Sequence, residues 1–153
     1  MDSEGEFSIE LVLQVDYRFA VHFANPVIPV LITDESAPVG AEAGPSPSEL
    51  LGTAVANCLA ASLLFALRKF KNQPDGLRAA VRVRMVRNEQ KRLRVGRIGV
   101  DLHIGIDGTT VQMLERILAQ FEDFCIVTQS VRAAIPVDVR VMDQFGRILK
   151  APT

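Results

Sequence analysis

The segment from Gly44 to Lys71 constrains the fold more than any other part of this 153-residue chain. Between Leu50 and Leu67 it carries no charged side chain, so the helix that it predicts is apolar nearly all round. Such a helix is either a membrane span or the buried axis of a globular core. Glycine and uncharged polar residues interrupt the apolar run, and we therefore favour the buried axis.

Both ends of this segment carry helix signals. Ser46 is suited to the N-cap and Pro47 to the first helical position, and Glu49 completes a capping box with Ser46. Basic residues stand at the far end, where cations stabilise the helix dipole. The sequence therefore predicts one long helix with Cys58 near its middle.

The first strands are predicted by alternation of side chains. Residues 7–23 alternate apolar and polar side chains almost without fault, which is a strong β signal with one buried face. This run is longer than a usual strand, so we expect a bend or a tight hairpin near Gln14 to Asp16. Val27 to Thr33 offers a second short strand, and a loop rich in proline, glycine and alanine follows from Asp34 to Gly44.

After the long helix, the pattern predicts a β-hairpin and a second helix. Ala79 to Arg87 and Leu93 to Ile106 form the hairpin. Thr109 or Thr110 can cap a helix whose apolar stripe ends at Cys125.

The end of the chain predicts a short helical turn and two more strands. Residues 127–134 suit the helical turn, residues 136–141 a strand, and residues 143–150 a terminal turn with a short edge strand. The order of elements is then β, β, α, β, β, α, β. Strands with two helices packed on a sheet face indicate an α+β fold.

Composition narrows the class of protein. A chain of this length with 48% hydrophobic and 23% charged residues fits a single globular domain over residues 1–153. Its net charge of −1 argues against nucleic-acid binding by bulk attraction. The acidic, polar start lacks a signal peptide, so we expect a cytoplasmic protein that is not bound to a membrane. His22 and His103 have no partner at metal-ligand spacing, and we expect no metal and no other cofactor.

Cys58 and Cys125 are the two cysteines of the chain, which is too few for a disulfide scaffold or a four-cysteine metal site. Free cysteine is among the most buried residue types, so a core position is the simplest interpretation of each. In a reducing compartment a bond between them would be transient and catalytic rather than structural. The residues alone leave both interpretations open.

The sequences around the two cysteines resemble the OsmC/Ohr family. The first motif is GPSPSELLGTAVANC, in which Pro-x-Glu-Leu-Leu precedes Cys58 in an alanine-rich helix. The second is FEDFCIVTQSVRAAIPVDV, in which Cys125 ends a helix ahead of a small turn and a valine-rich strand. The resemblance implies an α+β fold with antiparallel sheets packed on a long cysteine-bearing helix and a second helix. It also implies an intertwined homodimer whose active sites lie between subunits.

The resemblance further implies a thiol chemistry. In the peroxidase members of the family, the first cysteine reduces an organic or hydrogen peroxide and the second resolves the product as a disulfide. Carried over to this chain, Cys58 attacks the O–O bond, Cys125 resolves the sulfenic acid, and a dithiol reductant restores both thiols. The attacking sulfur must be a thiolate, which a nearby arginine held by a carboxylate would favour.

Arg18 and Glu49 are the candidates for that arginine and that carboxylate. The glutamate of the peroxidase subgroups stands ten residues before the first cysteine, a position that Ser48 occupies here. Glu49 is the next residue, about 100° further round the helix, where it is also suited to capping. Asp34 and Glu35 are alternative carboxylates that a loop could bring in.

Two other functions stay open. The chain could be a non-catalytic homodimeric module on the same fold that binds an apolar ligand or a partner between subunits. A single sheet covers one side of an apolar helix, so a second copy is a natural cover for the other side. The basic hairpin from Arg78 to Arg97 could contact phosphates or an acidic partner, although it has no aromatic side chain for base stacking. We favour a solvated, charged hairpin face there.

Overall fold

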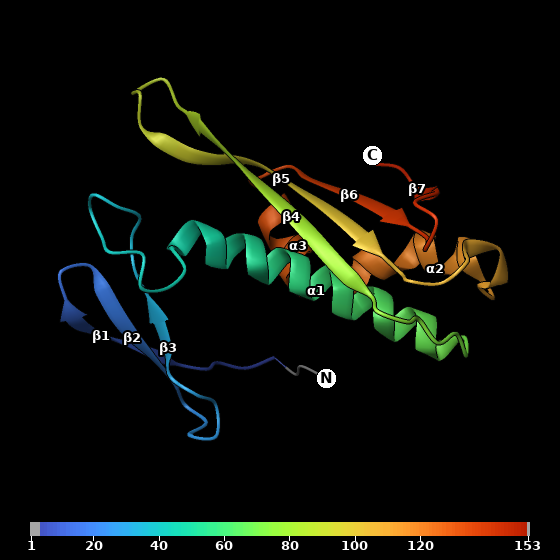
Figure 1. Cartoon of the computed structure of the whole chain (residues 1–153), viewed down its shortest axis with the longest axis horizontal. Coiled ribbons are helices and arrows are strands. Elements are labelled where there is room, and N and C mark those ends of the chain that lie inside the picture. The colour runs from blue at the N-terminus through green and yellow to red at the C-terminus, as the bar shows by residue number, and fades with distance from the viewer. Residues whose placement is uncertain (1–3, 153) are drawn as a thin grey trace. The chain divides into compact units, whose positions relative to one another are not determined.

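The computed structural model describes residues 4–152, which divide into two compact units. One unit extends through Leu50 and the other begins at Leu51. The prediction of a single domain stays a prediction, and each unit is described by itself below (Figure 1).

The N-terminal unit is a three-stranded antiparallel sheet in the order β1-β2-β3. Its strands are β1 (Ile9–Val15), β2 (Arg18–Phe23) and β3 (Leu31–Thr33). The predicted hairpin between β1 and β2 is confirmed, and Asp16 adopts a left-handed backbone conformation (φ 51°) in its two-residue turn.

The alternation in β1 predicted the strand correctly, but the prediction of a buried face is wrong for the single chain. All seven residues of β1 are exposed, including Leu11 at 55% and Leu13 at 56%. The apolar side chains of β1 thus form exposed apolar surface in the single chain. Contiguous surface of this kind on a protein commonly marks an interaction site.

The C-terminal unit contains a four-stranded sheet in the order β4-β5-β6-β7. Its strands are β4 (Arg78–Arg87), β5 (Leu93–His103), β6 (Val137–Met142) and β7 (Ile148–Lys150). The predicted β4–β5 hairpin and the terminal edge strand are confirmed. The expectation of antiparallel pairing holds for β4–β5 and β6–β7, whereas β5 and β6 pair in parallel. The reason is that residues 104–136 cross over between β5 and β6 instead of turning back as a hairpin.

The predicted long helix is α1 (Pro47–Lys69), and its capping box is confirmed. The Glu49 backbone N–H donates to Ser46 Oγ at 3.3 Å, and the Ser46 N–H donates to Glu49 Oε2 at 2.8 Å. By length and composition alone α1 could also cross a membrane. Its buried stripe packs instead in the core of the C-terminal unit, as in the core helix of a globular protein.

One side of the sheet carries the core. Alternate residues of β5 and β6 point inward and are buried, and α1 faces them with one side chain in every turn. The fully buried residues of α1 are Val55, Leu59, Leu63 and Leu67. The helix is not buried all round in the single chain, since Phe65 is 65% exposed.

The predicted second helix is broken into shorter pieces. Asp107, rather than Thr109 or Thr110, caps a 3-10 turn at Gly108–Thr110, and its carboxylate accepts the Thr109 N–H at 2.9 Å. The chain then turns through Met113, whose φ of 59° cannot continue a right-handed helix. The pieces that follow are α2 (Leu114–Gln120), a 3-10 turn (Phe121–Phe124) and α3 (Ile126–Arg132).

Buried Asn72 links the end of α1 to the start of this broken helix. Its side-chain amide donates to the carbonyl oxygens of Leu67 at 3.2 Å and Gln112 at 3.0 Å, and its Oδ1 accepts the Gln112 N–H at 2.7 Å. One amide thus satisfies backbone groups of both segments, which fixes the two cysteine-bearing parts of the fold relative to each other.

The closest packing of α1 on the sheet generates a stability prediction. A Cβ atom at Gly52 would lie 2.6 Å from Cγ2 of Val83 on β4. We expect Gly52→Val to lower the free energy of unfolding by about 1–3 kcal/mol through overpacking, although valine has the higher helix propensity. Urea unfolding followed by circular dichroism measures the change.

The matched control is Ala54→Val, at an exposed position two residues further along α1. Ala54→Val should lower the free energy of unfolding by only about 0.6 kcal/mol or less, which is the difference in helix propensity between alanine and valine. A Gly52→Val protein as stable as the wild type would contradict the close approach of helix and strand.

Candidate functional site

Cys58 lies near the middle of α1 and is partly buried. Its side chain packs against the core of the C-terminal unit. The α-helical spacing places it one residue before fully buried Leu59, so its sulfur lies at the border of the buried stripe.

Cys125 stands between the 3-10 turn Phe121–Phe124 and α3, where it serves as the N-cap residue of α3. Its side chain is fully buried. The prediction that Cys125 lies just past a helix end on the apolar side is confirmed. Its carbonyl oxygen accepts the N–H of Gln129 at 2.9 Å, so the first turn of α3 fixes the backbone at this cysteine.

The sulfur of Cys125 has two neighbours that matter for its chemistry. Its thiol donates to Oγ1 of Thr128 at 2.9 Å, and Thr128 is also fully buried. The Cys58 thiol is its second neighbour. Burial and the Cys58 thiol raise the pKa of Cys125 above its usual value, and the Thr128 contact lowers it by less.

The segment that carries Cys125 is held by a partly buried ion-pair network around Glu122. Arg132 on α3 donates to Glu122 Oε1 at 2.7 Å and to the Val137 carbonyl at 3.0 Å. Lys150 on β7 contacts Glu122 Oε2 and donates to the Leu118 carbonyl at 2.9 Å. Burial opposes ionisation of Glu122, but Lys150 and Arg132 hold its pKa below the usual value. The network therefore fixes the 3-10 turn, α3 and β7 around the cysteine.

The structure thus brings together the two cysteines that the sequence singled out, from segments far apart along the chain. Both are free thiols. Two adjacent thiols, one partly exposed and one enclosed, can exchange between a dithiol and a disulfide, and the more exposed sulfur is the one that a small oxidant meets first.

Arg18 and Glu49 lie in the N-terminal unit. Arg18, at the start of β2, forms an ion pair with Asp34, with 3.9 Å between Nε and Oδ2. Arg18 Nε is buried and has no hydrogen-bond acceptor among residues 4–152. Glu49 caps the first turn of α1 through the Ser46 N–H.

Asp34, named only as an alternative carboxylate from the sequence, is the carboxylate that pairs with Arg18. It is buried and accepts the backbone N–H groups of Glu35 at 2.8 Å, Ala41 at 3.2 Å and Ala43 at 3.1 Å. The hydrogen bond from Ala43 is the main cause that holds the pKa of Asp34 below its usual value. Asp34 is therefore a fixed, ionised partner that limits where the Arg18 guanidinium can lie.

Thr128 is a neighbour of Cys125 that sequence reasoning missed. The signal was the spacing Cys-x-x-Thr at the start of α3, because an N-cap residue and the third residue of the first turn lie next to each other. In the described part of the chain, no group of three histidine, cysteine or acidic side chains is arranged to hold a metal ion.

Comparison with known protein families gives one match. The family model described as OsmC-like protein matches residues 40–140, about two thirds of the chain, and this range includes both cysteines. No curated protein matches the chain closely enough to count as a relative.

Solved structures share the fold at low sequence identity. An OsmC-like protein of unknown function from Vibrio cholerae is 14% identical, with a TM-score of 0.74 over 89% of this chain and 99% of that chain. The organic hydroperoxide resistance protein OsmC from Legionella pneumophila is 15% identical, with a TM-score of 0.63 over 90% of this chain and 98% of that one. The organic hydroperoxide resistance protein OhrB of Bacillus subtilis is 14% identical, with a TM-score of 0.62 over 88% and 98% of the two chains.

The environment of Cys125 generates a labelling prediction. Because its side chain is fully buried and its pKa is raised, Cys125 in the folded protein should react with iodoacetamide at least about tenfold more slowly than in guanidinium chloride. Its labelling should also keep increasing at pH values where an ordinary cysteine is already ionised. Peptide mass spectrometry of timed samples measures both effects.

Cys58 in the same samples is the internal reference, since its side chain is partly exposed. Equal labelling rates for Cys125 in the folded and the denatured protein would contradict the enclosed position of its sulfur.

Proposed function

The chain belongs to the OsmC-like protein family, and from that premise we propose that it is a redox protein that reduces organic or hydrogen peroxides with Cys58 and Cys125. The observation that carries the proposal is the contact between a partly exposed thiol on α1 and an enclosed thiol at the start of α3. The two solved structures named above from Legionella pneumophila and Bacillus subtilis are described as organic hydroperoxide resistance proteins, which supports the same substrate class.

The first chemical step falls to Cys58. Its thiolate attacks one oxygen of the peroxide, an S–O bond forms, the O–O bond breaks, and the second oxygen leaves as an alcohol or water after protonation. The sulfur is oxidised to sulfenic acid and the peroxide is reduced. Cys125 does not compete for this step, because its raised pKa keeps it protonated at neutral pH and its side chain is enclosed.

The second step joins the two sulfurs. The Cys125 thiol gives up its proton as its sulfur attacks the sulfenic sulfur of Cys58, an S–S bond forms, the S–O bond breaks, and the hydroxyl group leaves with that proton as water. Thr128 holds the Cys125 sulfur at the start of α3 for this attack. A dithiol reductant then reduces the disulfide and returns both thiols.

The proposal gives Arg18 the task of favouring the Cys58 thiolate. A guanidinium stays charged at every relevant pH, and a cation near a thiol stabilises the ionised form. Support comes from Asp34, which is fixed by three backbone N–H groups and pairs with Arg18. The proposal assigns Glu49 to capping α1, and its catalytic role stays a prediction.

We extend the proposal to a cytoplasmic homodimer. The exposed apolar side chains of β1 and of Phe65 on α1 support a second copy as their cover. A monomeric mass by light scattering at micromolar protein would count against it. The alternative function is a non-catalytic homodimeric module that binds an apolar ligand or a partner between subunits. The exposed apolar side chains of β1 also support this alternative.

Substitution of the cysteines separates these functions. With cumene hydroperoxide in stopped-flow assays, Cys58→Ser should abolish peroxide consumption, because serine is no nucleophile at neutral pH. Cys125→Ser should still react once, and dimedone should trap the sulfenic acid on Cys58, but no disulfide should form. If Cys58→Ser consumes peroxide as fast as the wild type, the proposed peroxidase function is ruled out and the binding module is favoured.

Substitution of Arg18 tests the activating cation. Arg18→Ala should lower the rate constant for reaction with peroxide by about 10- to 100-fold, since a lost charge contact of this kind is worth about 1.4–2.7 kcal/mol. Arg18→Lys keeps the charge and should recover part of the rate, and the loss in Arg18→Ala should shrink as the pH is raised.

Arg94→Ala, at an exposed position on β5, is the control for removal of one positive charge. If Arg18→Ala reacts with peroxide as fast as Arg94→Ala, then Arg18 has no part in activating the thiol.

A further inference from the structure

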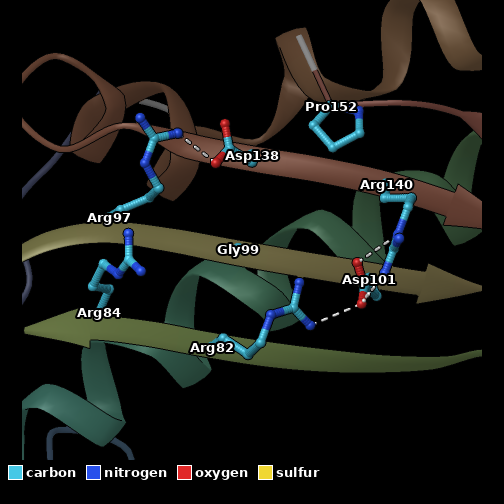
Figure 2. A pocket seen from close by; sticks show the side chains of 8 residues that line it. All are labelled: Arg82, Arg84, Arg97, Gly99, Asp101, Asp138, Arg140 and Pro152. Atoms are coloured by element: carbon cyan, nitrogen blue, oxygen red, sulfur yellow. Dashed lines mark hydrogen bonds and ion pairs between the residues drawn. The ribbon is translucent and has the colours of Figure 1, made fainter.

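The outer side of the four-stranded sheet, opposite the core, holds a charged pocket that the cysteine chemistry does not use. It is an open cavity of about 380 Å³ over β4, β5 and β6. Figure 2 shows its side chains rising from the three strands on the same side of the sheet. Their positions follow from the strand alternation, because the residues between them point inward to the core.

We propose that this outer pocket binds a small anion with at least two negative charges on phosphate or carboxylate oxygens. Four arginines and two aspartates line it, so its formal charge is +2. Guanidinium groups match the geometry of such oxygens, because each offers paired N–H donors.

Three of the four arginines are held in place by carboxylates. The Asp101 carboxylate on β5 accepts a hydrogen bond from Nη1 of Arg82 at 2.8 Å. It also accepts hydrogen bonds from Nε and Nη2 of Arg140 at 3.0 and 2.8 Å. These hydrogen bonds, first from Arg140 and then from Arg82, lower the pKa of Asp101 to about 2, so it stays ionised. Asp138 holds Arg97 at 2.6 Å in the same way. The guanidinium groups are therefore oriented before any ligand arrives, which reduces the entropy lost on binding.

The donors that remain face the pocket. Each guanidinium has five N–H groups, and Asp101 takes one from Arg82. Arg84 on β4 has no ion-pair partner among residues 4–152, although it stands directly across the strand pair from Arg97. Asp138 pairs with Arg97 alone, so the neighbouring Arg84 leaves a positive charge that an anion can neutralise.

Gly99 keeps the floor of the pocket open. It lies at the centre of β5, paired with Arg82 on β4. A Cβ atom at this position would come within 3.2 Å of Nη2 of Arg82, so a larger residue would push the guanidinium aside. The glycine thus leaves room for the Arg82 guanidinium to reach Asp101 (Figure 2).

The size and lining of the pocket favour a small molecule over a nucleic acid. Its volume is at the lower end of the range for small-molecule sites. No aromatic side chain lines it, so it offers no surface on which a base could stack. This site is separate from the thiols, which lie in the core on the other side of the sheet.

Calorimetric titration at low salt tests the proposal, with inorganic pyrophosphate and citrate as probes. At least one should bind with a Kd below about 1 mM, and the better probe identifies phosphate or carboxylate as the preferred group. Arg84→Ala should weaken binding by about tenfold or more, because it removes charge-assisted hydrogen bonds.

Two further variants make the test specific. Arg92→Ala removes an equal charge from the turn of the same hairpin, outside the pocket, and should change the Kd less than about twofold. Gly99→Val should weaken binding while the protein stays folded, since the side chain it meets is a movable guanidinium. Thermal unfolding confirms that each variant is folded.

Three results would overturn the proposal. The first is that neither probe binds with a Kd below about 1 mM. The second is equal loss of affinity in Arg84→Ala and Arg92→Ala, which would indicate diffuse charge attraction. The third is binding of heparin without binding of either small probe, which would indicate a surface for an extended polyanion.

Discussion

The packing of one stripe of α1 against the inner face of the mixed sheet is the interaction on which the rest of the C-terminal unit depends. Leu59, Leu63 and Leu67 are fully buried there, and each contributes roughly 1.5–3 kcal/mol relative to an exposed side chain. The same contact fixes the position of Cys58 on the helix and closes the core around Cys125. The position of the thiol pair therefore depends on this core packing.

Successive side chains of β5 point to opposite faces of the sheet, so one strand contributes to both the core and the charged pocket. Ile98, Val100 and Leu102 point inward to the core and the thiols, while Arg97, Gly99 and Asp101 point outward to the charged pocket. A register shift of one residue would exchange the two sets, burying charges and exposing aliphatic side chains. Selection for the core thus also holds the charged side chains in position, whether or not a ligand binds them.

Most of the fold could be predicted from local sequence signals. The predictions that were wrong concern features that depend on contacts between residues far apart in the chain. The capping box at Ser46 and the strand alternations depend on neighbours in sequence, so they could be recognised without the structure. The parallel pairing of β5 with β6 depends on residues far apart, and the break at Met113 depends on a backbone conformation that its side chain does not signal. Both cysteines were recognised as candidates from the sequence, but the pairing of Arg18 with Asp34 within the N-terminal unit required knowledge of how the loop after β3 folds.

The parallel pair β5–β6 has a consequence for how such a protein can vary. Because parallel neighbours cannot be joined by a hairpin, the connecting chain has to travel the length of the sheet, and this chain carries Cys125. An insertion or deletion within it would move the second sulfur along α1 and leave every strand pair unchanged. The separation of the two sulfurs thus depends on the length of this connection, and it can change without any change in the sheet.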